Sequence, residues 1–177
     1  MFKFIIQFLF ILLIFSSCGN PDPNINEQGK DELKAHEVKK VLNPKDQKYK
    51  DVIYVPIYSD IYADRTNQKI LLAATLSIRN TSATDSLFLS KIDYYNTDGE
   101  LVRSYAENII SLSPMGTINY VIEKDDDTGG PGANFIVELT SQNVNVKPLI
   151  QAVMVGYIGN KAFTFLTDGY SIGEENK

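Results

Sequence analysis

The amino-acid sequence predicts an all-β protein, an antiparallel β-sandwich of immunoglobulin-like general form with about eight strands. From Asp51 onward apolar and polar residues alternate with a period of two, and turn-forming residues recur about every 8–12 residues, which is typical of sandwiches. No stretch between Asp51 and Tyr170 carries the apolar repeat of a strong helix. We therefore expect a β-sandwich domain over residues 51–177, preceded by a signal peptide (1–17) and a polar tether (18–50).

The chain begins with the features of a secretory signal peptide. Lys3 gives a positive start, and the run from Phe4 to Phe15 is apolar except for Gln7. A run of about a dozen residues is too short to span a bilayer core of ~30 Å, which needs a helix of about 20 residues. The pattern is instead that of the hydrophobic region of a signal peptide.

Cys18 is the candidate lipidation site. Ser16 and Ser17 precede it and Gly19 follows, which resembles a bacterial lipobox, where the cysteine is lipidated and the signal is removed. Cys18 is the only cysteine of the chain, so no intramolecular disulfide competes for its thiol. The alternative is an ordinary signal peptide with an incidental cysteine. We expect a bacterial envelope lipoprotein whose multiply acylated Cys18 holds it on a membrane, since one acyl chain binds only marginally. The residues after Cys18 favour the periplasmic face of the outer membrane.

The tether from Cys18 to Lys50 is polar and contains two early prolines, Pro21 and Pro23, which favour an extended segment. A short helix with a thin apolar stripe is an option for Lys30–Leu42, and its lysines would suit an anionic lipid surface. Acidic residues are interleaved with those lysines, and this favours a solvated spacer.

The domain is predicted to contain eight strands: Val52–Tyr58, Lys69–Asn80, Leu87–Tyr95, Leu101–Tyr105, Thr117–Glu123, Asn134–Thr140, Ile150–Ile158 and Ala162–Leu166. Pro56 predicts an edge position for the first of them, because proline has no N–H to give to a ladder. Ile150–Ile158 is apolar on both faces, which predicts a central strand. Gly99 and Gly159 mark tight hairpin turns.

Charge and composition exclude several classes of function. Residues 51–177 contain nine basic and sixteen acidic residues, a net charge of −7, so nucleic acid is not an expected partner. The only histidine, His36, lies in the tether, and the domain has no cysteine. This removes Ser-His-Asp and Cys-His nucleophile pairs and the usual zinc and copper ligands. We expect no catalysis; the alternative is a carboxylate-dependent hydrolase acting on envelope glycans.

The stretch from Asp125 to Leu139 joins three carboxylates to a glycine-rich run and then to a strand. Asp125, Asp126, Asp127 and Asn134 are candidate calcium ligands, because Ca²⁺ prefers six to eight oxygen atoms and glycine carbonyls add to these side chains. The alternative is a structural connection whose glycines take positive φ. No other cofactor is expected.

Tyr54, Tyr58 and Tyr62 are candidate ligand contacts. They are four residues apart, so on one continuous strand they would share a face and offer an aromatic strip to a sugar or a peptide. Packing at the rim and in the core is the competing interpretation, and the abundance of tyrosine in this chain favours it.

Several segments together resemble a known family of exported bacterial proteins. They are YVPIYSDIY (Tyr54–Tyr62), LAATLSIRNT (Leu72–Thr81), DYYNTDGELVRSY (Asp93–Tyr105), DTGGPGANFIVE (Asp127–Glu138) and AVMVG (Ala152–Gly156). The family is catalogued as domain of unknown function 3124. The resemblance implies an exported, often lipidated, single-domain protein and brings no functional residues with it. The sequence thus predicts a binding module on a lipid anchor, with an envelope protein or glycan as its partner.

Overall fold

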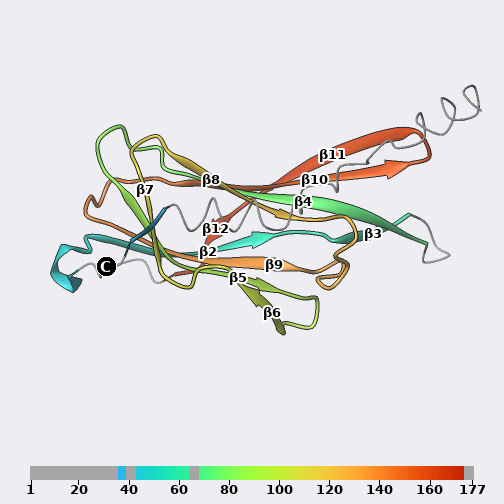
Figure 1. Ribbon diagram of the computed structural model, residues 1–177, viewed down its shortest axis with the longest axis horizontal. Coiled ribbons are helices and arrows are strands. Elements are labelled where there is room, and N and C mark those ends of the chain that lie inside the picture. The colour runs from blue at the N-terminus through green and yellow to red at the C-terminus, as the bar shows by residue number, and fades with distance from the viewer. Residues whose placement is uncertain (1–35, 39–42, 64–67, 174–177) are drawn as a thin grey trace, which may run out of the picture.

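A computed structural model describes residues 36–38, 43–63 and 68–173 of the chain. Within them, twelve strands form two antiparallel sheets that lie one over the other, and Figure 1 shows both layers. The predicted antiparallel β-sandwich is confirmed. The predicted signal peptide and Cys18 lie outside the described residues. No helix among the described residues is both long enough and apolar enough to cross a bilayer.

The first sheet has the order β1-β7-β5-β9-β2-β12, and β6 also pairs with β5. Its strands are β1 (Glu37–Val38), β2 (Tyr49–Pro56), β5 (Leu87–Tyr95), β6 (Leu101–Ser104), β7 (Ile109–Leu112), β9 (Asn134–Ser141) and β12 (Tyr170–Ser171). The second sheet has the order β11-β10-β4-β3, and β8 also pairs with β4. Its strands are β3 (Asp60–Tyr62), β4 (Lys69–Arg79), β8 (Thr117–Ile122), β10 (Leu149–Ile158) and β11 (Lys161–Asp168). A single 3₁₀ turn, Pro44–Asp46, precedes β2.

Each of the eight predicted strands is present, and the four additional strands β1, β3, β7 and β12 are short. A short helix was one option for Lys30–Leu42. Within that segment the structure describes residues 36–38, and there it shows strand β1 instead of a helix. Glu37 and Val38 pair with Ile110 and Ile109 of β7, and the His36 carbonyl accepts a hydrogen bond from the Ser111 N–H at 2.9 Å. Part of the predicted tether is therefore attached to the sandwich.

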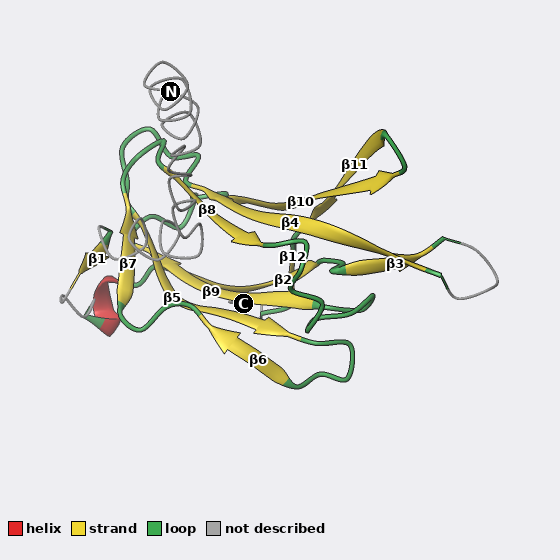
Figure 2. Cartoon of the chain, turned by 45° about the vertical axis from the view of Figure 1, so that its right-hand side comes forward, coloured by secondary structure: helices red, strands yellow, loops and turns green. Residues whose placement is uncertain are grey.

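The chain passes from the first sheet to the second between β2 and β3. Strand β2 ends at Pro56, and the carbonyl of Pro56 accepts a hydrogen bond from the Thr167 hydroxyl of β11. On the side of β2 away from β9, strand β12 pairs only with Ile53 and Tyr54. At Pro56 strand β2 therefore lies at the edge of the sheet, as predicted from the missing N–H of proline. Figure 2 shows β3 at the far end of the second sheet, beyond the end of β2.

The core lies between the two sheets and follows the period-two alternation. Leu72, Ala74, Leu76 and Ile78 of β4 point inward and are buried, and Phe135, Val137 and Leu139 of β9 face them from the first sheet with no exposed surface. Strand β10 pairs with β11 on one side and β4 on the other along most of its length, which confirms its predicted central position.

Candidate functional site

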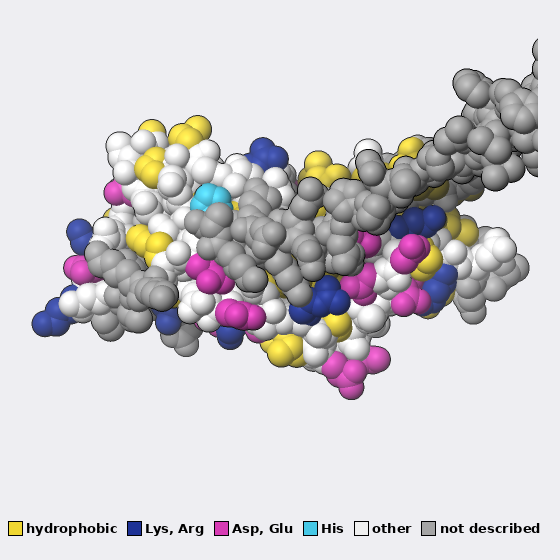
Figure 3. All heavy atoms as spheres, viewed as in Figure 1, with side chains coloured by type: hydrophobic (Ala, Val, Ile, Leu, Met, Phe, Trp, Pro, Cys, Tyr) yellow, Lys and Arg dark blue, Asp and Glu magenta, His cyan; other side chains and the backbone are white. Residues whose placement is uncertain are grey.

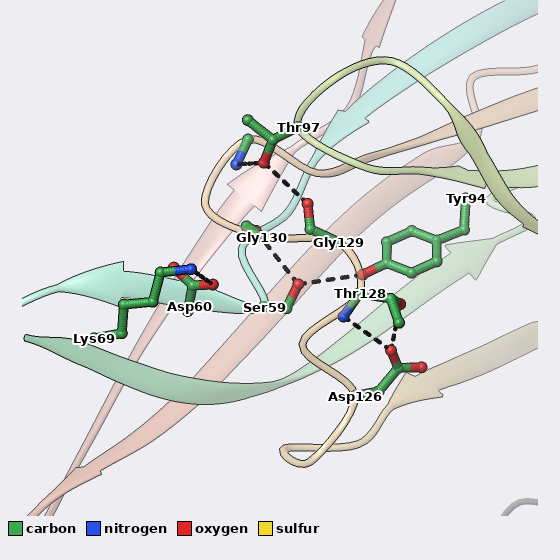
Figure 4. A network of polar contacts seen from close by, with 10 residues as sticks. Ser59, Asp60, Lys69, Tyr94, Thr97, Asp126, Thr128, Gly129 and Gly130 are labelled. Atoms are coloured by element: carbon green, nitrogen blue, oxygen red, sulfur yellow. Dashed lines mark hydrogen bonds and ion pairs between the residues drawn. The ribbon is translucent and has the colours of Figure 1, made fainter.

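The connection between β8 and β9 holds the acidic and glycine-rich residues. We call residues 125–134 the glycine loop. One side of it is attached to the β5–β6 hairpin through Thr97, as Figure 4 shows. The Thr97 N–H and hydroxyl both donate to the Gly129 carbonyl, at 2.9 and 3.0 Å, and the Gly132 N–H donates to the Thr97 Oγ1 at 2.9 Å. One threonine thus fixes the loop by three hydrogen bonds.

Ser59, in the crossing between β2 and β3, attaches the other side of the glycine loop. Its N–H donates to the Gly130 carbonyl at 3.1 Å, and its hydroxyl lies 3.3 Å from both that carbonyl and the Tyr94 hydroxyl (Figure 4). Ser59 and Tyr94 are fully buried. Burial raises the pKa of Tyr94, so its hydroxyl keeps its proton and the pair stays neutral around physiological pH.

Two neighbouring glycines of the loop are required for different reasons. Gly130 has φ of 72°, in the left-handed region that other residues adopt at a cost. Gly129 has no positive φ, but a Cβ there would lie 1.9 Å from the Tyr94 hydroxyl and 2.6 Å from the Ser59 Oγ. The glycines therefore have structural roles in this connection: Gly130 allows a positive φ, and Gly129 leaves room for the Tyr94 and Ser59 hydroxyls.

The structure gives the four candidate calcium ligands different surroundings. Asp126 accepts hydrogen bonds from the N–H and hydroxyl of Thr128 and pairs with Arg103 at 3.3 Å. Asn134 is the first residue of β9 and is paired with Pro56 and Tyr95, while Asp125 and Asp127 are exposed. Among the described residues, no group of three or more Asp, Glu, His or Cys side chains is arranged to hold a metal ion. Calcium binding by the loop stays a prediction, which the melting temperature with calcium and with chelator would test.

An ion pair between a buried carboxylate and a half-exposed lysine lies beside the glycine loop. Asp60 of β3 has no exposed surface, and its Oδ2 accepts a hydrogen bond from the Lys69 ammonium of β4 at 2.9 Å. This bond raises the pKa of Lys69, and the nearby charge of Asp127 acts in the same direction. The Asp60 Oδ1 is the one buried side-chain oxygen or nitrogen in the described chain without a hydrogen-bond partner.

The three candidate tyrosines do not lie on one continuous strand. Tyr54 of β2 packs against Tyr170 with ring centroids 5.3 Å apart, and Tyr58 packs against Phe165 at 5.8 Å. Tyr62 belongs to β3 in the other sheet, is 54% exposed and has the Lys69 ammonium 6.0 Å from its ring centroid. Tyr54 and Tyr58 thus have packing roles, whereas Tyr62 lies beside Lys69, whose ammonium pairs with Asp60.

All these groups lie within one family domain. The family model described as "Protein of unknown function (DUF3124)" matches residues 50–172. The chain belongs to this family. The resemblance predicted from the sequence is therefore confirmed, and the DUF3124 domain spans the sandwich from β2 to β12. A solved structure, "Crystal Structure of Thermotoga maritima 1070", is similar at 18% identity with a TM-score of 0.38, over 68% of this chain and 92% of that one. No curated protein matches the sequence.

Sequence reasoning found the loop of the DUF3124 domain but missed the residues that hold it. Thr97, Ser59 and Tyr94 come from three other segments, and no local pattern marks them as neighbours of the loop. The Asp60–Lys69 pair was also missed. A weak signal existed, because Asp60 interrupts an apolar and aromatic run and Lys69 opens the next strand.

Proposed function

We propose that this DUF3124 protein is a non-catalytic binding module, held by lipidated Cys18 on a membrane of the bacterial cell envelope. The lipobox-like end of the signal peptide supports the anchor, and Gly19 without an acidic run nearby supports the periplasmic face of the outer membrane. The partner is an envelope protein or glycan. The β-sandwich supports this assignment, since such scaffolds present loops and strand ends at their two ends.

The surface at Tyr62 and Lys69, which we call the Tyr62 surface, carries the proposal; it includes Asp127, whose charge acts on the Lys69 ammonium. It combines a half-exposed aromatic ring, an ammonium group held by a buried carboxylate, and an exposed carboxylate. A ring of this kind stacks on a sugar or an apolar side chain, and the two charges pair with polar groups of the same ligand. Acidic and basic side chains are also interspersed over the face shown in Figure 3, which suits a polar partner better than a uniformly charged polymer.

Replacement of Tyr62 with alanine is expected to weaken binding at least about tenfold, since removal of an aromatic hot-spot residue costs about 2 kcal/mol or more. The measurement is the retention of isolated peptidoglycan and of solubilised envelope proteins on the immobilised chain, compared between the unmodified protein and Tyr62→Ala. Tyr157→Ala is the matched control, because Tyr157 is equally exposed but lies on β10.

Equal binding by Tyr62→Ala and the unmodified chain would contradict the Tyr62 surface as the binding site. Incubation of the same proteins with a panel of glycans, followed by measurement of glycan hydrolysis, tests the alternative function of a hydrolase. Turnover that is abolished by changing a single acidic residue would assign a carboxylate-dependent hydrolase in place of a binding module.

The anchor is tested separately by Cys18→Ala. Without the thiol no acyl chains can be attached, and each acyl CH₂ contributes about 0.8 kcal/mol to membrane binding. We expect the acyl modification to disappear and the protein to move from the membrane pellet to the soluble fraction after cell lysis and centrifugation. Ser17→Ala, which keeps a small residue before the cysteine, is expected to stay in the pellet. Persistence of Cys18→Ala in the pellet would contradict the lipoprotein assignment.

A further inference from the structure

Strand β11 forms one edge of the second sheet. It pairs with β10 along all eight of its residues and, within the described chain, with no strand on its other side. Exposed edges invite pairing with another chain, and proteins usually protect them by shortness, proline, bulges or central charges. Strand β11 has no proline, its register with β10 is regular, and no residue between Lys161 and Asp168 is ionisable.

The other edges of the described sheets are better protected. Strands β1 and β12 have two residues each and β3 has three, while β6 has four and includes Arg103. Strand β2 has eight residues, but β12 covers it at Ile53 and Tyr54 and it ends in Pro56. Strand β8, with six residues, runs directly into Glu123 and the acidic end of the glycine loop. Strand β11 is thus the longest unprotected edge in the part of the chain that the structure describes.

The backbone groups that β11 offers to a new strand can be identified. The Gly169 N–H donates to the Ile150 carbonyl of β10 at 2.8 Å, and the Ile158–Lys161 pair closes the hairpin. Because backbone direction alternates along a strand, odd-numbered residues of β11 direct their N–H and C=O groups to β10. Ala162, Thr164 and Leu166 therefore direct theirs outward, and their side chains are exposed.

A row of three apolar side chains and one threonine leads across the sheet to this edge. Val121 of β8 is opposite Thr75 of β4, Thr75 is opposite Val153 of β10, and Val153 is opposite Leu166 of β11. Val121, Val153 and Leu166 are 48%, 38% and 57% exposed, which is unusual for neighbouring residues of one sheet face. A strand added next to β11 would cover the free side of Leu166 and continue the row.

We propose that β11 pairs antiparallel with β11 of a second copy of this chain, so that the second sheets of two molecules join into one sheet. The charges fit this arrangement, because β11 is positive at Lys161 and negative at Asp168. Antiparallel pairing places the positive end of one strand beside the negative end of the other. The acidic domains, which carry −7 over residues 51–177, meet along an uncharged segment. A twofold axis closes the assembly at two copies, and this self-association goes beyond the proposed function.

The test measures the mass of the full chain in a mild detergent by sedimentation and light scattering over a range of concentrations. We expect a dimer, and we expect Leu166→Lys to raise the dissociation constant at least tenfold because it places a charge in the paired edge. Val121→Lys is the matched control. It introduces the same charge into the same row at the opposite edge, and it is expected to leave the dimer intact.

A second variant tests the backbone pairing itself. Thr164→Pro removes an N–H that points away from β10, so the β10–β11 ladder survives while the new ladder loses a donor. We expect this variant to be folded, by circular dichroism, and monomeric. The proposal is overturned if the unmodified chain is monomeric at high concentration, or if both edge variants remain dimeric. It is also overturned if Val121→Lys alone dissociates the dimer, or if the chain forms open polymers instead of closed dimers.

Discussion

Replacement of Phe135 with alanine is expected to lower the free energy of unfolding by about 3–5 kcal/mol, the usual effect of removing a fully buried phenylalanine. Phe135 belongs to β9 of the first sheet, and its side chain points into the core between the two sheets with no exposed surface. Its ring packs against those of Tyr94 and Tyr105, with centroid distances of 5.3 and 6.0 Å. The loss would be a large part of the roughly 5–15 kcal/mol that stabilises a typical domain.

Urea unfolding followed by circular dichroism measures this effect. Tyr157→Ala is a suitable control, since Tyr157 is 56% exposed and its truncation is expected to change the stability by less than about 0.5 kcal/mol. A loss of less than about 1 kcal/mol at Phe135 would contradict its placement in the core between the sheets.

Replacement of Gly129 with alanine is expected to lower the free energy of unfolding by about 1–3 kcal/mol, the usual effect of inserting extra atoms into a well-packed core. The added methyl would lie 1.9 Å from the Tyr94 hydroxyl and 2.7 Å from the Ala133 Cβ. Tyr94 is fully buried and cannot move aside, so the loop must shift. That shift would also weaken the hydrogen bonds between Ser59 and Gly130.

A double-mutant cycle with Tyr94→Phe tests the cause of this cost. Removal of the hydroxyl removes the closest contact of the new methyl, although Ser59 and Ala133 remain near it. Gly129→Ala is therefore expected to cost less in the Tyr94→Phe background than in the unmodified chain. The same cost in both backgrounds would show that the hydroxyl is not what forbids a side chain at residue 129.

Much of the fold follows from local pattern, and the exceptions have physical causes. Strands such as β4 and β10 are long, and each alternating residue points either to the core or away from it, so their sequence carries the signal. Strands β3 and β12 are too short for a period to be seen. Their existence depends on which strand lies beside them, and this is decided by the rest of the fold.

The candidate site was less predictable, because its parts meet only in three dimensions. The carboxylates and glycines of the glycine loop can be recognised in the sequence because they follow one another within ten residues. Ser59 and Gly130, however, are 71 residues apart, and Thr97 and Gly129 are 32 residues apart. No sequence pattern distinguishes Gly130, which needs a positive φ, from Gly129, which needs room for the Tyr94 hydroxyl.

If Cys18 anchors the chain as proposed, the pairing of β1 with β7 shortens the distance that the domain can move from the membrane. If the chain were free from Cys18 to Tyr49, where β2 begins, a fully extended segment would reach about 110 Å. Because Glu37 and Val38 are paired with β7, the segment that could extend would end near His36 and reach at most about 65 Å. A lipid-anchored copy would therefore sample a much thinner layer next to the bilayer, and only partners within that layer would be accessible to it.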